Sequence, residues 1–194
     1  IYQIELESHV QLGFLCLASI KDFEKKIIKP HEKIYENRKI ERADQMINLN
    51  TQIGPIYAAY PEEKNIHDLL LSQIKNPPSY DFESFDNSVH RLWCVNDIKF
   101  IKKLKSLMKN VNAIYIADGH HRMGAMQYIS KKNPLNEKFM IAAFPTNESK
   151  IFDYNRVIKD LNGLTKNKFL EILSKNFKIS ISNKPIKPSK RYEF

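Results

Sequence analysis

The stretch AIYIADGHHRM, residues 113–123, decides the fold class because two structural patterns meet inside it. Residues 113–117 form a short apolar run of the length expected for a buried strand. Asp118 and Gly119 end this run, and apolar residues then return at the three-residue spacing of a helix face: Met123, Met126 and Ile129. The stretch therefore predicts a strand, a tight turn and a helix in direct succession.

Strand-like and helix-like segments alternate along the rest of the chain. Apolar or alternating runs predict strands at residues 10–19, 56–60, 89–95, 139–144 and 177–181. Helical spacing predicts helices near residues 21–26, 40–49, 66–74 and 98–108 and from Thr165 onward, with Asn96 or Asp97 capping the fourth of these. Because the two patterns alternate, the sequence predicts an α/β fold.

Length and composition bound the class of protein. The chain has 194 residues, of which 42% are hydrophobic and 27% charged, and these are ordinary values for a globular protein. Since that length suits one hydrophobic core, we expect a single domain over residues 1–194. No apolar run approaches the roughly 20 residues of a membrane-spanning helix, so no membrane partner is expected.

The two ends and the cysteines bear on the origin of the chain and its location. The sequence begins at Ile1 and closes with a Pro- and Lys-containing tail over residues 183–194, which indicates an excerpt of a longer chain. The first ten residues lack the basic start and apolar run of a signal peptide. Cys16 and Cys94 both lie in apolar, strand-like text, where we expect buried, reduced thiols. These observations together predict a cytoplasmic protein.

The net charge raises the question of an anionic partner. There are 31 Lys and Arg residues against 22 Asp and Glu residues, which gives a formal charge of +9. Such a balance favours phosphate-bearing ligands or nucleic acid. The lysines are spread along the whole chain, however, and no helix-turn-helix pattern or clustered basic face is visible. We therefore expect a solvated basic surface and no nucleic-acid partner.

The turn at Asp118-Gly119-His120-His121-Arg122 carries the chemistry of the sequence. In α/β proteins phosphates bind where a strand passes into a helix, because the first helical N–H groups lack partners and the helix dipole is positive there. Asp118 can cap the helix or face a metal, and Gly119 lets the backbone approach a ligand. The two histidines and Arg122 add donors and charge. We expect these five residues to lie at a cleft with their amides available to phosphate.

A second candidate segment precedes this unit. Pro30 interrupts the chain and places His31 and Glu32 on a loop, where a rigid scaffold can present them. Two further polar positions, Arg91 and Arg156, fit a structural salt bridge as well as a ligand contact.

Several segments together resemble one family, the domain of unknown function numbered 1015. The resemblance runs from about Gly13 to Phe177 and rests on these segments in order: IKPHEK at 28–33, GPIYAAY at 54–60, HRLWCV at 90–95, YIADGHHR at 115–122 and YNRVIKDLNGL at 154–164. The family is similar to ParB/sulfiredoxin-like proteins, which implies an α/β domain with a mixed sheet. That group includes kinases that phosphorylate free serine, so the resemblance also implies phosphoryl transfer.

The resemblance further implies the ligands and the roles of the site residues. It implies a nucleotide, ATP or ADP, with Mg²⁺, and a small polar acceptor such as serine. Glu32 matches the acidic residue that acts on the acceptor hydroxyl in such kinases. The implied catalytic residues are Glu32, Asp118 and His120, the implied nucleotide contacts are Gly119, His120, His121 and Arg122, and the implied metal ligand is Asp118.

Two other interpretations remain open at this point. A metal-dependent hydrolase is one, because His31, Glu32, Asp118 and His120 are all residue types that bind metals. Adjacent histidines on a helix point about 100° apart, however, so His120 and His121 reach one ion only if the turn is not helical. The other is a nucleotide- or DNA-binding module of ParB-like kind that carries out no reaction.

Overall fold

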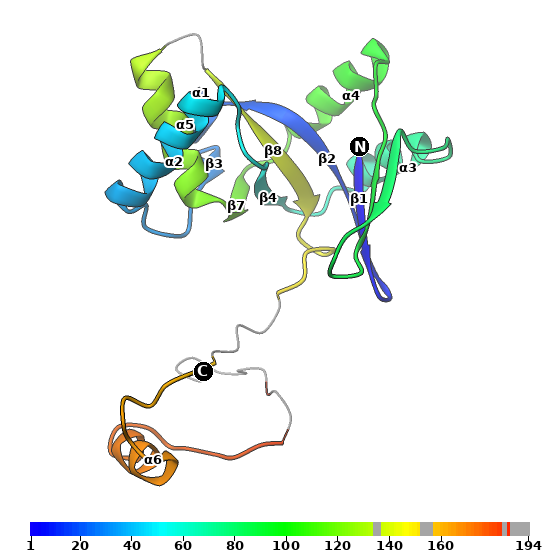
Figure 1. Ribbon diagram of the computed structural model, residues 1–194. Coiled ribbons are helices and arrows are strands. Elements are labelled where there is room, and N and C mark those ends of the chain that lie inside the picture. Colours follow the sequence, from blue (N-terminus) through cyan, green and yellow to red (C-terminus); the bar gives the residue numbers. More distant parts are fainter. Residues whose placement is uncertain (134–136, 152–156, 184–185, 187–194) are drawn as a thin grey trace. The chain divides into compact units, whose positions relative to one another are not determined.

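The computed structural model describes residues 1–133, 137–151, 157–183 and 186, and the chain divides into two compact units (Figure 1). The first unit, Ile1–Ser149, contains the sheet and the candidate site. The second unit, Lys150–Phe194, contains helix α6 (Lys166–Ser174), whose cap is the predicted Thr165. The single domain expected over residues 1–194 stays a prediction. Arg156 and most of the predicted tail at 183–194 lie outside the described residues.

In the described part of the chain, eight strands form one mixed sheet in the order β3-β7-β4-β8-β2-β1-β6-β5. Their bounds are β1 Tyr2–Leu6, β2 His9–Ser19, β3 Ile28–Lys29, β4 Ile56–Tyr60, β5 Tyr80–Glu83, β6 Val89–Leu92, β7 Ile114–Asp118 and β8 Lys138–Pro145. β3 pairs with β7 and β4 with β8 in parallel, and the other pairs are antiparallel. The predicted α/β fold with a mixed sheet is confirmed, while the ParB/sulfiredoxin-like relation stays a prediction.

The helices of the first unit form two groups. Their bounds are α1 Ile20–Glu24, α2 Glu36–Leu49, α3 Lys64–Gln73, α4 Ile98–Met108 and α5 His120–Lys132. α1, α2 and α5 lie together beside β3 and β7, and α3 packs against α4 in a separate group (Figure 1). Asp97 caps α4 as predicted, because its carboxylate accepts from the Lys99 amide at 2.8 Å. None of the described helices is long and apolar enough to cross a membrane.

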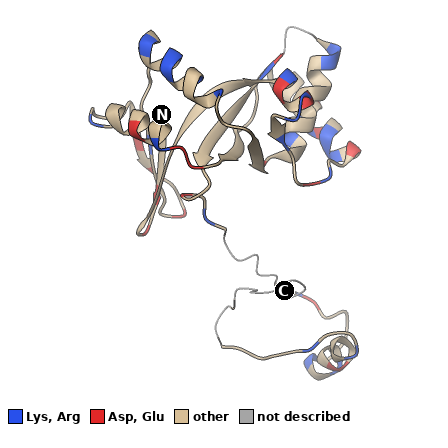
Figure 2. Cartoon of the chain, turned by 180° about the vertical axis from the view of Figure 1, so that it is seen from behind, with Lys and Arg blue, Asp and Glu red and all other residues tan. Residues whose placement is uncertain are grey.

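Charged residues are spread over the first unit, as the sequence predicts. Figure 2 shows Lys and Arg side by side with acidic residues on the helices of both groups. The apolar core lies between the sheet and these helices. Its largest fully buried side chains are Tyr60, Phe139, Phe144, Ile28, Ile56, Ile66, Leu70, Ile116 and Met123.

The structure differs from the sequence predictions at individual strands and at the two cysteines. Residues 177–181 form no strand, because alternation makes a strand only where a neighbouring strand offers hydrogen bonds, and none of the described strands pairs with them. β1, β3 and β5 were missed, since β1 and β5 are half-buried or exposed and carry no apolar run, and β3 has only two residues. Cys16 and Cys94 are free thiols, as expected, but both are exposed rather than buried.

A glycine allows the central strands to approach each other. Gly13 of β2 lies opposite Tyr2, and a Cβ on it would stand 2.1 Å from the Ala143 oxygen and 2.7 Å from Cδ1 of Phe144. Phe144 therefore lies over the glycine, where its ring contacts Tyr2 at 5.7 Å and stacks on Tyr57 at 5.3 Å. Tyr57 is in turn paired with Asp118, so this packing extends to the strand that ends at the candidate site.

We predict that Gly13→Ala lowers the free energy of unfolding by about 2–3 kcal/mol or more, because the added methyl group would overlap backbone of β8. Chemical denaturation followed by circular dichroism measures this change. Val10→Ala on the exposed part of the same strand is the matched control and should cost less than about 1 kcal/mol. Equal stability of the Gly13 variant and the parent would contradict the close packing of β2 and β8.

Candidate functional site

The predicted strand, turn and helix are confirmed at residues 113–123. β7 ends at Asp118, Gly119 adopts a left-handed conformation with φ of 96°, and α5 begins at His120. Gly119 is the N-cap and offers no side chain, so capping, one of the two roles considered for Asp118, is not the one it has. The first amides of α5 are therefore left without a side-chain acceptor, which is the condition for an anion to bind them.

Arg122 fastens the turn to the loop before β4. Its guanidinium donates from Nη1 to the Pro55 carbonyl at 2.6 Å and from Nη2 to the Asp118 carboxylate. Two glycines with positive φ make room for it. A Cβ would stand 2.9 Å from Nη1 at Gly54 and 3.0 Å from Nε at Gly119. The phosphate contact predicted for Arg122 stays a prediction, but two of its N–H groups already have partners inside the protein.

The loop after β3 brings His31 and Glu32 to the start of α5. The His31 backbone N–H donates to Nε2 of His120 at 3.3 Å, and the His31 Nδ1–H donates to the Ile116 carbonyl at 2.7 Å. The two imidazoles meet edge to face, with ring centres 4.4 Å apart. Nδ1 of His120 lies 3.5 Å from Oε2 of Glu32. We call His31, Glu32 and His120 the His–Glu centre.

These contacts fix where the proton of His120 resides. Because Nε2 accepts the His31 N–H, the neutral ring carries its hydrogen on Nδ1, which faces the Glu32 carboxylate. The His120 side chain is only 3% exposed, whereas that of Glu32 is 60% exposed. The buried His120 ring can thus orient one oxygen of the Glu32 carboxylate, while the other oxygen is open to a ligand.

Burial and the neighbouring His31 both favour the neutral form of His120. Loss of solvent lowers the pKa of His120 below its ordinary value, and the adjacent His31 lowers this pKa further. The Glu32 and Asp118 carboxylates act in the opposite direction but do not outweigh burial. The contact between His120 and Glu32 is therefore one between a neutral donor and a carboxylate near pH 7.

The starts of α2 and α5 lie next to each other at this site. Gly124 of α5 permits the approach, since a Cβ there would stand 2.7 Å from Cγ2 of Ile34. The Tyr35 amide donates to Nε2 of His121 at 3.4 Å, and the two rings stack at 5.9 Å with 8° between their planes. Tyr35 is the N-cap of α2 and, like Gly119, caps no amide with its side chain. The starts of α2 and α5 are therefore joined through the Tyr35–His121 pair, and in α2 the Arg38 amide donates to the Asn37 side chain at 2.9 Å.

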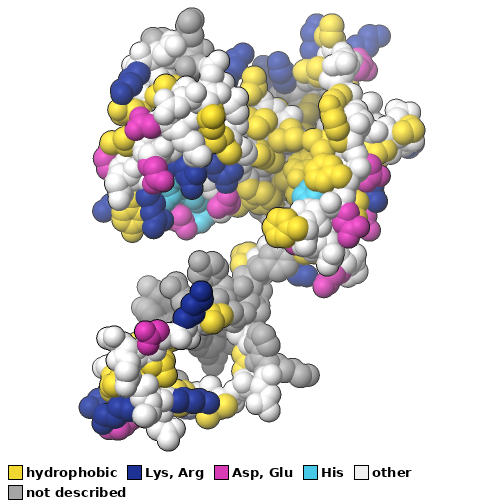
Figure 3. Space-filling view, in the orientation of Figure 1, with side chains coloured by type: hydrophobic (Ala, Val, Ile, Leu, Met, Phe, Trp, Pro, Cys, Tyr) yellow, Lys and Arg dark blue, Asp and Glu magenta, His cyan; other side chains and the backbone are white. Residues whose placement is uncertain are grey.

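The structure brings some predicted residues together and separates others. Glu32 and His120 meet, whereas His121 faces Tyr35 and the Asp118 carboxylate is bound to Arg122. Two different directions for the adjacent histidines agree with the expected angle between neighbours on a helix. In Figure 3 histidines lie among basic and acidic side chains on one face of the first unit. Arg91 forms a structural salt bridge with Glu5 at 2.7 Å.

Several residues that hold this site lie outside the segments predicted to carry the chemistry. Tyr35 and Gly124 were not predicted as site residues, and Gly54 and Pro55 were considered only as part of the segment at 54–60. The signal for Gly54 and Pro55 was present in the segment GPIYAAY, while Gly124 within α5 had no signal outside its helical spacing. The cleft expected at the turn stays a prediction, since the two cavities described for this chain are lined by other residues.

The His–Glu centre is also a group that could hold a metal ion. One ligand atom from each of His31, Glu32 and His120 lies within 4.8 Å of the others. Asp118, the predicted metal ligand, is not in this group. Ligation through Nδ1 of His120 would require a hydrogen on Nε2, which would then face the His31 N–H, another donor. The present hydrogen bonds thus suit proton handling better than metal binding.

The fold and the site define an α/β protein with a His–Glu centre at a strand-to-helix turn. A family model described as "Protein of unknown function (DUF1015)" matches residues 1–194, and the chain belongs to this family. The resemblance seen in the sequence is thereby confirmed for the family. No curated protein and no solved structure matches the chain.

We predict that His120 makes stability depend on pH. Since its pKa is lowered in the folded state, the unfolded chain binds a proton first as the pH falls below about 6.5, and folding loses stability there. The loss is at most about 1.4 kcal/mol per pH unit. Denaturation at pH 5.5 and 7.5 should show a larger fall for the parent than for His120→Gln, whose amide does not titrate. Equal falls in both proteins would show that His120 is not held neutral.

Proposed function

We propose that this protein transfers a phosphoryl group from a nucleotide, ATP or ADP, to the hydroxyl of a small polar acceptor such as free serine. The observation that carries the proposal is the exposed Glu32 carboxylate, 3.5 Å from buried His120, beside two uncapped helix starts. Phosphoryl transfer requires little covalent chemistry from a protein and depends on positioning, charge neutralisation and a carboxylate that orients the hydroxyl. Glu32 and the two helix starts are the groups that would meet these requirements here.

The helix starts supply the phosphate-binding part. The amides at the start of α5 have no side-chain acceptor, and α2 begins beside them through the Tyr35–His121 contact. The N-terminus of each helix is the positive end of its dipole, and both N-termini lie at this site. Arg38 lies close by, with its guanidinium 5.9 Å from the Tyr35 ring centre. A nucleotide phosphate would therefore meet the first amides of α5 together with positive charge from both helix starts, whereas the Arg38 amide of α2 already donates to the Asn37 side chain.

Glu32 supplies the proton acceptor. The Nδ1–H of His120 faces one carboxylate oxygen, so the other oxygen can accept a hydrogen bond from the acceptor hydroxyl. As the new bond from the hydroxyl oxygen to phosphorus forms, the bond to the leaving nucleotide oxygen breaks and the hydroxyl proton passes to Glu32. Catalytic contacts often tighten only once substrate is bound, which fits the 3.5 Å separation in the free protein.

Asp118 is suited to a Mg²⁺ ion that accompanies the nucleotide. Mg²⁺ prefers oxygen ligands and is commonly held by one or two carboxylates together with substrate phosphates. The Asp118 side chain is exposed, and Arg122 binds one of its two oxygens. The second oxygen is thus available on the same turn as the α5 amides. When bound there, Mg²⁺ would neutralise phosphate charge.

We predict that Glu32→Gln lowers kcat by about 10²–10⁴-fold and leaves nucleotide affinity nearly unchanged, because it removes the proton acceptor and keeps the shape. Incubation with ATP or ADP, Mg²⁺ and a set of hydroxyl amino acids, followed by mass spectrometry, measures the phosphorylated product. Isothermal titration calorimetry measures nucleotide binding. Glu41→Gln, an exposed carboxylate on α2, is the charge-matched control and should retain full turnover. Full activity of the Glu32 variant would remove Glu32 from the mechanism.

Arg122→Ala tests the phosphate end of the site. We predict that nucleotide binding weakens at least tenfold, since a charge-assisted bond to phosphate contributes about 1.5–3 kcal/mol. The same change also breaks the bonds to Pro55 and Asp118, so the thermal midpoint must be measured in parallel. Gln52→Ala, which loses bonds from its amide to backbone of the loop before β4 and of β8, is a control for structural loss without charge loss. Unchanged affinity in a folded Arg122 variant would exclude the phosphate contact.

A metal-dependent hydrolase is the second candidate, because His31, Glu32 and His120 present ligand atoms within 4.8 Å of one another. The two candidates differ in what Glu32→Gln does. If Glu32 is a ligand, the variant loses bound Zn²⁺ or Mn²⁺ measured by elemental analysis, and excess metal partly restores hydrolysis. If Glu32 accepts a proton, metal content stays the same and excess metal restores nothing.

A further inference from the structure

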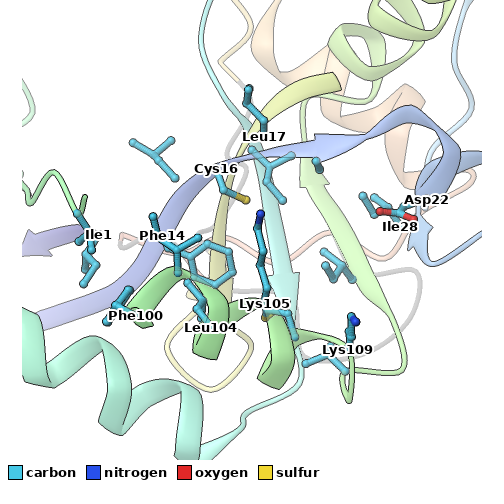
Figure 4. A pocket seen from close by; sticks show the side chains of 18 of the residues that line it. Ile1, Phe14, Cys16, Leu17, Asp22, Ile28, Phe100, Leu104, Lys105 and Lys109 are labelled. Carbon is cyan, nitrogen blue, oxygen red and sulfur yellow. The ribbon is translucent and has the colours of Figure 1, made fainter. Parts of the chain in front are cut away.

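A large apolar cavity lies in the first unit, away from the His–Glu centre. Its volume is about 940 Å³, which falls within the range of small-molecule sites in proteins. Its walls come from β2, from α4, from residues 92–95 and from the first residues of β3 and β7 (Figure 4). Since the His–Glu centre lies beyond the carboxyl ends of β3 and β7, the cavity is at the other end of these two strands.

The lining is apolar except for a few groups. Phe14, Phe100 and Leu104 are typical of the walls. Two lysines line the cavity, Lys105 in the last turn of α4 and Lys109 at its C-cap, four residues apart. In the described part of the chain no salt bridge joins either lysine to a carboxylate.

The two ends of the cavity differ in charge. Figure 4 shows the Lys105 ammonium directed toward Cys16, while Asp22 lies beside Ile28 at a distance from it. Among the described lining residues Asp22 is the one carboxylate. The Lys105 ammonium, which no carboxylate among the described residues pairs with, thus faces the part of the cavity nearest α4 and β2.

Cys16 lies on the wall of the cavity, and its thiol is exposed. The surrounding apolar walls raise the pKa of Cys16 to about 11, and Lys105 only partly opposes this. The thiol is therefore accessible from the cavity but disfavoured in its charged form.

We propose that this cavity binds an amphipathic anion, namely a long-chain fatty acid, with its acyl chain along the apolar walls and its carboxylate at Lys105 and Lys109. A flexible chain of methylenes suits an irregular apolar space of this volume. A carboxylate would form ion pairs with the ammonium groups of Lys105 and Lys109, which no carboxylate among the described residues binds. A ligand with many polar groups would leave most of them without partners. This proposal is independent of the phosphoryl transfer proposed for the His–Glu centre.

Titration of the full chain with the fluorescent fatty acid cis-parinaric acid, and its displacement by palmitate, tests the proposal. We expect one palmitate per chain. The double variant Lys105→Met and Lys109→Met should weaken palmitate binding at least tenfold while changing the binding of the neutral analogue hexadecanol less than threefold. Lys102→Met, on α4 but outside the cavity lining, is the matched control and should bind palmitate like the parent.

A second measurement keeps the result interpretable. Both Cys16 and Cys94 line the cavity, so saturating palmitate should slow their reaction with N-ethylmaleimide at least tenfold. Absence of palmitate binding, or binding without thiol protection and without dependence on the two lysines, would overturn the proposal. Thiols that are already protected in a chain that sediments as a dimer would instead show that a second copy covers the cavity, and this too would overturn it.

Discussion

The hydrogen bond from the His31 backbone N–H to Nε2 of His120 is the interaction on which the candidate site depends. It places the hydrogen of the neutral ring on Nδ1 and turns that hydrogen toward Glu32. It requires β3 to lie parallel beside β7, so that the loop after β3 reaches the start of α5. It also requires Gly124, because a larger residue there would separate α2 and its preceding loop from α5.

Local patterns were sufficient to predict most of the elements but not their arrangement. The apolar run at 113–117 and the helical spacing after it predicted β7 and α5 correctly, because both patterns arise within one segment. The short strands β1 and β5 were missed because they carry no apolar run of their own, and each is held by pairing with the strand that follows it, β2 and β6. The strand predicted at 177–181 from its alternating pattern was wrong, because no described strand pairs with these residues.

The chemistry of the site was easier to predict than its geometry. A turn with two histidines and an arginine is rarely needed for packing, and Glu32 and His120 do meet. The sequence could not show that Arg122 would donate to the Pro55 carbonyl, because these two residues come from segments far apart in the chain. Nor could it distinguish the two histidines, whose different partners follow from their positions around α5.

The central claim is that buried His120 is neutral, with its hydrogen on Nδ1 directed at Glu32. Nitrogen-15 NMR of histidine-labelled protein at pH 7.5 tests this most directly, because it distinguishes protonated from non-protonated ring nitrogens. The account predicts a non-protonated Nε2 and a protonated Nδ1 for the ring assigned by its loss in His120→Gln. A hydrogen on Nε2, or a doubly protonated ring at that pH, would contradict it.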